Sequence, residues 1–374
     1  MKSQQVSKII LIINSDFNDK VLELLSKCGI LKFYNSVGRQ NYLRKAMNFP
    51  NFFAGGHVVS ARQSDIFRFY IPHEYEKRML SYLSNRLNLK VAGNGSVFAQ
   101  DAEIISKSRK LYSEEMLEKL PQADNCNLFS YNLVKAIVQH GSADSISKSI
   151  LEMGYGVPAV YFGEGVGLRQ KLGLLRIVIP ADKEIILIPV LTSSTESFVE
   201  TIKKVVRLDI PGRGVLFVEP IRAINVNIRI YQDTTLRHAA TMDQIITSID
   251  IMHGSTDWRA RNVPAKSSKQ SSREKEYCNF VLIAEEDSLG DTIQAALARG
   301  VGGATSTDYN EHFYDEEEKK MLSYQTKEGC EMIVNENQKN DILTVMKESG
   351  FYDDEINGIL EITDLNFFYL PRNK

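Results

Sequence analysis

The feature that most constrains this chain is an alternation of short apolar runs with helix-forming segments that end at a glycine. Residues 8–14 form the first apolar run, and the helical segment after it stops at Gly29. The alternation recurs before Gly154 and Gly300. Short apolar runs are typical of buried strands, a 3.6-residue apolar period indicates an amphipathic helix, and glycine commonly follows its last turn. Each third of the chain is therefore expected to contain strands and helices.

Within each third, the pattern reads as strand, helix, strand, strand, helix and strand. In the first third, Phe67 and Phe69 alternate with polar residues, as expected of a half-buried strand. In the middle third, Phe198 and Ile202 share one helical face. The β-α-β-β-α-β order is that of the split βαβ, or ferredoxin-like, unit. We therefore predict an α+β fold of three tandem ferredoxin-like (βαββαβ) units.

The units and the segments between them set the predicted domain boundaries. A serine-rich run at residues 267–272 favours a flexible linker. The first unit is predicted at residues 1–105, the second at 127–225 and the third at 277–374. The intervening parts are a helical connector at 106–126 and a helix with the flexible linker at 226–276.

Composition excludes several classes of protein. The 374 residues include 45 Lys plus Arg and 47 Asp plus Glu, a formal net charge of -2, which argues against a dedicated nucleic-acid-binding protein. Apolar stretches are shorter than the roughly 20 residues that cross a bilayer, so no membrane insertion is expected. The cysteines form no CxxC pair and the histidines show no ligand spacing, which predicts a cytoplasmic protein without a metal site.

Two kinds of glycine-bearing loop recur at fixed places in this pattern. The first follows the second strand and contains Gly38, Arg39 and Gln40, and then Gly167, Arg169, Gln170 and Lys171. The second precedes the last strand and contains Gly93 and Gly95, and then Gly212, Arg213 and Gly214. Glycines let backbone N–H groups approach a phosphate, and an arginine can bind one through two hydrogen bonds. These residues are the predicted ligand-binding site.

The loops resemble those of the nitrogen-regulatory PII family of signalling proteins. Residues 163–173 are similar to the start of that family's T-loop, and residues 212–215 are similar to its B-loop. Residues 300–305 resemble the segment that leads into its second strand. Proteins of this family are homotrimers that bind ATP or ADP between subunits. The resemblance implies three PII-like units packed as an intramolecular pseudo-trimer, with clefts between the units and a monomeric chain.

The resemblance also implies a function. The protein would bind ATP, ADP, AMP or another small effector and control a target protein, an enzyme or a membrane transporter, through its loops. Ser96 and Val215 stand where the family has a phosphate-binding lysine, which favours a smaller or less charged ligand. No catalytic residue is predicted.

Three other functions fit the same pattern. An ACT-like amino-acid sensor uses the same unit topology. An enzyme of acylphosphatase type on a ferredoxin-like fold needs an arginine in the first strand–helix loop, where residues 14–16 are Asn-Ser-Asp. A purely structural scaffold is the third alternative. No Walker loop or nucleophile elbow is present in the sequence to favour an enzyme.

Overall fold

A computed structural model describes most of the chain. The described residues are 2–45, 57–89, 91, 93–107, 110–123, 130–166, 181–210, 212–226, 276–315 and 320–369. The predicted flexible linker and the helix expected before it lie outside these residues. The predicted domain boundaries stay predictions.

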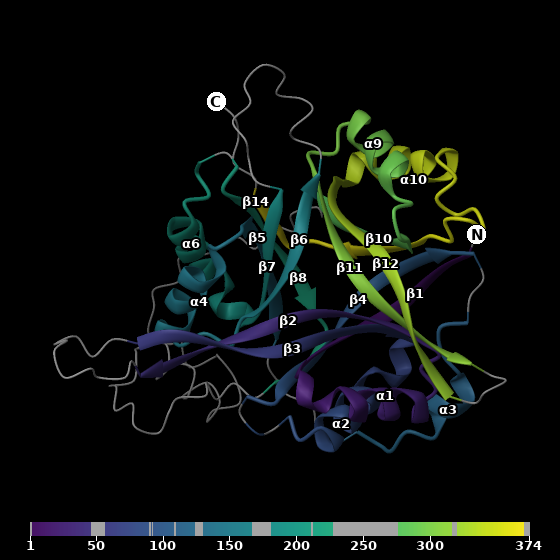
Figure 1. The fold of residues 1–374 in the computed structure, drawn as a ribbon, viewed down its shortest axis with the longest axis horizontal. Helices are drawn as coiled ribbons and strands as arrows, with labels where there is room; N and C mark the ends of the chain where they lie inside the picture. Colours follow the sequence, from purple (N-terminus) through teal and green to yellow (C-terminus); the bar gives the residue numbers. More distant parts are fainter. Residues whose placement is uncertain are drawn as a thin grey trace, which may run out of the picture.

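The described strands belong to a single 14-stranded antiparallel sheet (Figure 1). The strands are β1 (Lys2–Asn14), β2 (Lys32–Lys45), β3 (His57–Ile71), β4 (Gly95–Ser106), β5 (Tyr131–Gln139), β6 (Ala159–Val166), β7 (Asp182–Leu191), β8 (Gly214–Ile221), β9 (Ala223–Val226), β10 (Tyr277–Glu285), β11 (Ala304–Asp315), β12 (Lys320–Asn335), β13 (Ile359–Asp364) and β14 (Phe367–Tyr369). They lie in the order β11-β12-β10-β13-β4-β1-β3-β2-β6-β7-β5-β8-β14, with β9 paired to β4.

The sheet closes because β11 pairs with β6 as well as with β12. Nine of the strands, from β11 through β12 and β4 to β6, thereby form a closed antiparallel barrel. The predicted fold class, three tandem ferredoxin-like units packed as a pseudo-trimer, is therefore wrong. Strands from different thirds pair with one another, as β4 does with β13, because an unpaired strand edge leaves its N–H and C=O groups unsatisfied. The local patterns that suggested separate units carry no information on these long-range pairings.

Seven helices in the described residues lie around the outside of the sheet, most of them in three groups (Figure 1). They are α1 (Asn18–Lys27), α2 (Glu76–Arg86), α3 (Glu114–Glu118), α4 (Ala143–Glu152), α6 (Thr195–Val206), α9 (Gly290–Ala298) and α10 (Lys339–Glu348). The helix end predicted at Gly29 is confirmed, since Gly29 follows α1 and its φ is +78°. The connector helix is shorter than predicted, because α3 has 5 residues.

Apolar side chains fill the space between each helix group and the sheet. Val21 and Leu25 of α1 pack with Phe67 and Phe69 of β3, and all four are almost fully buried. Phe198 of α6 is buried in the same way against β5 and β7. Burial of each such side chain stabilises the fold by about 1.5–3 kcal/mol. These packed layers hold the strands in place, including β6, β7, β8 and β11, whose ends line the cavity described below.

Candidate functional site

A cavity of about 430 Å³ lies where β6 meets β11. Its walls come from parts of the chain that are distant in sequence: the ends of β6 and β7, the turn before β8, and the segment that leads into β11. Gly165 pairs with Thr305 across the β6–β11 junction, and both residues line the cavity. Two loops that the sequence singled out, residues 212–215 and 300–305, thus meet at one place.

Two glycines of the lining lie close to neighbouring strands. A Cβ atom on Gly165 would lie 2.9 Å from the Cε of Lys183, so a side chain here would displace the end of that lysine. Gly214 has φ +153°, and a Cβ atom there would lie 2.4 Å from the carbonyl oxygen of Ile137. Only glycine adopts such a conformation this close to another strand without strain.

An aromatic pair forms one wall of the cavity. Tyr277 of β10 and Phe368 of β14 line it, with ring centroids 5.0 Å apart and ring planes inclined at 53°. Phe368 reaches this place because β14 pairs with β8. Such rings can contact the face of a planar ligand. Neither residue was predicted from the sequence, because no local pattern shows which strands lie beside the cavity, such as β14 beside β8.

The polar lining offers a cation, a hydroxyl group and two amides. Lys183 is the one lysine or arginine among the described lining residues, and Thr305, Asn335 and Gln338 supply neutral polar groups. Glu331 also lines the cavity. Its Oε1 atom lies 2.5 Å from the Nζ of the buried Lys135, which neutralises the charge of its carboxylate. The lining therefore combines apolar surface with one lysine, one paired carboxylate and a few neutral polar groups.

The structure brings some of the predicted site residues to this cavity. Gly212 and Gly214 line it, whereas the neighbouring Arg213 is exposed and does not. Gly93 precedes β4 and Gly95 begins it; neither lines the cavity, and both have positive φ. The other predicted residues of the middle third, Gly167, Arg169, Gln170 and Lys171, lie outside the described residues.

The predicted loop of the first third forms part of strand β2. Gly38, Arg39 and the buried Gln40 pair with β6. One guanidinium nitrogen of Arg39 donates to Glu184 at 2.8 Å and to Asp144 at 3.2 Å. The structure therefore places this arginine against two carboxylates, a different setting from the phosphate contact expected from the sequence.

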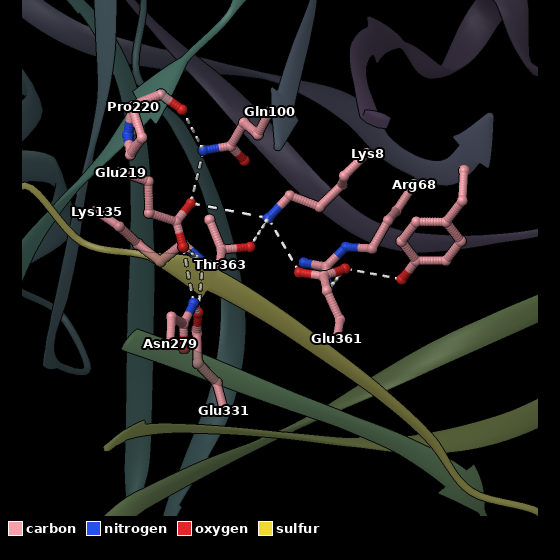
Figure 2. Close-up of polar contacts among 11 residues, drawn as sticks. Lys8, Arg68, Gln100, Lys135, Glu219, Pro220, Asn279, Glu331, Glu361 and Thr363 are labelled. Carbon is pink, nitrogen blue, oxygen red and sulfur yellow. Dashed lines mark hydrogen bonds and ion pairs between the residues drawn. The ribbon is translucent and has the colours of Figure 1, made fainter. Parts of the chain in front are cut away.

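A network of charged side chains lies inside the sheet, next to the cavity (Figure 2). Its cations are Lys8, Arg68 and Lys135, and its carboxylates are Glu219, Glu331 and Glu361. All six belong to strands and are less than a tenth exposed. Three positive and three negative charges balance, as buried ions require.

Hydrogen bonds fix the carboxylates of this network. The side-chain amides of Gln100 and Asn279 donate to Glu219 at 2.9 and 2.7 Å. Burial by itself would raise the pKa of Glu219, but the ammonium groups of Lys135 and Lys8 lower it to about 2. A cavity of about 10 Å³ beside Arg68 and Lys135 leaves room for about one water molecule. The network itself therefore has no room for a ligand, whereas the β6–β11 cavity has a volume of about 430 Å³.

The described residues contain neither a cluster of metal ligands nor a helix that could span a membrane. Among the described residues, no group of three or more His, Cys, Asp or Glu side chains is arranged to hold a metal ion. In the same part of the chain, no helix is both long enough and apolar enough to cross a membrane. Comparison with known proteins adds no assignment: no protein-family model matches the sequence, and no similar curated protein is found.

Proposed function

We propose that the protein is a regulatory protein of the PII-like kind, which binds a small metabolite or an adenine nucleotide at the β6–β11 junction and controls a partner protein. The observation that carries this proposal is the cavity of about 430 Å³ bounded by the turn at Gly212 and Gly214 and by residues 300–305. Its volume is within the range of ordinary small-molecule sites.

The lining supports a ligand with one aromatic part and one anionic part. Tyr277 and Phe368 supply aromatic surface for a base, and Lys183 is the lysine of the described lining. A charge-assisted hydrogen bond contributes about 1.5–3 kcal/mol. Because the described lining contains one lysine, a monophosphate matches its charge better than a triphosphate.

Control of a partner would follow from the position of the cavity between strand ends. A ligand that contacts Val166, Lys183 and Thr305 touches three different strands, β6, β7 and β11. Binding then favours the arrangement in which these strand ends lie close together. The shift in population is set by how much more tightly the ligand binds this arrangement than the alternative arrangements. A partner that recognises this arrangement would respond to ligand concentration.

The proposal places the protein in the cytoplasm, as its cysteines suggested. Cys28, Cys278 and Cys330 are free and buried. Burial raises the pKa of the Cys28 thiol to about 12, which keeps it protonated and unreactive.

A ligand screen by thermal unfolding tests the proposal. ATP, ADP, AMP, cyclic nucleotides and amino acids are added in turn to the wild-type chain, to Lys183→Ala and to Lys148→Ala. Lys148 is a matched control because its ammonium group is exposed on α4, far from the cavity lining. An adenine nucleotide at about 100 times its Kd should stabilise the wild type and the control by about 2.7 kcal/mol.

The outcomes separate the candidate functions. Lys183→Ala should weaken the response to the nucleotide, whereas Lys148→Ala should leave it unchanged. Stabilisation by amino acids and not by nucleotides would replace the proposal with an ACT-like sensor. No stabilisation by any of these compounds would contradict both.

A further inference from the structure

The carboxylate of Glu331 uses its two oxygen atoms unequally (Figure 2). Its Oε1 atom accepts one hydrogen bond from the Nζ of Lys135 and another from the Nδ2 of Asn279, each at 2.5 Å. Both donors are buried, and neither lines the β6–β11 cavity. Within the part of the chain that the structure describes, no hydrogen bond or ion pair involves Oε2. One oxygen of this side chain is therefore still able to accept a hydrogen bond.

The strand register places Glu331 on the side of β12 that faces the cavity. Glu331, Ile333 and Asn335 are spaced two residues apart on β12, and all three line the cavity. Side chains with this spacing share one face of a strand. Thr305 pairs with Glu331 across β11 and β12 and also lines the cavity. The carboxylate thus belongs to the cavity wall as well as to the charge network.

The surroundings of Glu331 shield it from bulk water. The residue is only 7% exposed, although it borders the cavity. A buried charged oxygen without a hydrogen-bond donor is unfavourable, because it has lost the water that binds it in the unfolded chain. A carboxylate accepts hydrogen bonds and donates none. A molecule that fills the cavity must therefore donate to this oxygen, and a ligand that displaces water without doing so loses affinity.

We propose that Oε2 of Glu331 determines the specificity of the cavity by selecting ligands that present a hydrogen-bond donor to it. For the adenine nucleotide of the proposed function, this donor is the amino group of the base. That assignment rests on the proposed function, whereas the selection of a donor rests on the contacts of Glu331 alone.

The first test compares two nucleotides that differ in this donor. AMP carries an amino group on its base, and purine riboside monophosphate carries a hydrogen atom in its place. Calorimetry with the full chain measures both dissociation constants. We expect the wild type to bind AMP more tightly by about tenfold or more, because the analogue leaves the buried oxygen without a donor.

The second test changes the acceptor. In Glu331→Gln, the donors Lys135 and Asn279 hold the amide oxygen at the position of Oε1, so the amide nitrogen, which only donates, replaces Oε2. This variant should lose the preference for AMP. The matched control is Glu219→Gln, because Glu219 also accepts a hydrogen bond from Asn279 but does not line the cavity. The control should keep the preference. Circular dichroism establishes that each variant is folded, and the comparison of nucleotides on the wild type decides the matter if Glu331→Gln is not.

A probe unrelated to nucleotides separates this inference from the proposed function. Naphthylmethylammonium has planar rings and an ammonium donor, and its methyl ether analogue has a methoxy group in place of the ammonium and no donor. The wild type should bind the ammonium probe more tightly than the ether by about tenfold or more. If it does so while neither nucleotide binds, the proposed nucleotide function fails and the role of Glu331 stands.

The opposite results are equally definite. Equal binding of AMP and its analogue to the wild type would overturn the inference and leave the proposed function intact. An undiminished preference for AMP in folded Glu331→Gln, or the same loss of preference in Glu219→Gln, would also overturn it. Binding of neither the nucleotides nor the ammonium probe would contradict both.

Discussion

The Oε1 atom of Glu331 lies 2.5 Å from the Nζ atom of Lys135 inside the sheet, and both residues are less than a tenth exposed. Glu331 also lines the β6–β11 cavity, so the same side chain borders the candidate site and the buried charge network. The wall of the site is thereby held by an ion pair between β5 and β12, strands that begin almost two hundred residues apart in the sequence.

Removal of Lys135 should destabilise the protein strongly. Lys135→Met leaves the buried carboxylates of Glu331 and Glu219 without their nearest common cation, and we expect the free energy of unfolding to fall by about 3–5 kcal/mol. The control is Lys119→Met, which breaks an exposed pair with Glu115 and should cost less than about 1 kcal/mol. Urea unfolding measures both. Equal small losses would contradict the prediction.

Stability should decrease in acid because of Glu219. Its pKa is about 2 in the folded chain and near 4.5 when unperturbed, so the unfolded chain binds the proton first. The stabilisation is complete above pH 4.5 and is lost as the pH falls toward 2. Urea unfolding at several pH values should show a flatter dependence for Glu219→Gln in this window. An unchanged slope in that variant would argue against a paired, ionised Glu219.

His312 should make the stability of the protein depend on pH in a higher pH range than Glu219 does. Burial lowers its pKa to about 4 from 6.5, so between these values the unfolded chain binds a proton that the folded chain does not. Stability therefore decreases as the pH falls from 6.5 toward 4, and His312→Gln should reduce this decrease. Titration followed by NMR tests the cause directly: an imidazole that becomes charged near pH 6.5 in the folded protein would contradict it.

Arg39 should couple more strongly to Glu184 than to Asp144. The carboxylate of Glu184 is 2% exposed, whereas that of Asp144 is 66% exposed and surrounded by water. Two double-mutant cycles, Arg39→Ala with Glu184→Gln and Arg39→Ala with Asp144→Asn, separate these pairs. We expect a coupling above about 1 kcal/mol for Glu184 and between about 0 and 1 kcal/mol for Asp144. The reverse order would show that the buried contact does not hold Arg39.

The sequence alone located many local elements, because their causes are local. The apolar period of Val21 and Leu24 and the glycine after them determine where α1 forms and where it ends. The glycine-bearing turn at Gly212 and Gly214 was also recognised, since positive φ values favour glycine regardless of the rest of the fold.

The tertiary structure alone decided how these elements assemble. Pairing of β4 with β13 joins residues more than two hundred positions apart, and it depends on which strand edges are left unpaired, which no local pattern encodes. The same holds for side chains: Phe368 lines the cavity only because β14 pairs with β8, and Arg39 of β2 contacts Glu184 only because β6 brings β7 near β2. The sequence thus determined the strands, helices and turns, whereas long-range strand pairing closed the sheet and placed the cavity of about 430 Å³ where β6 meets β11.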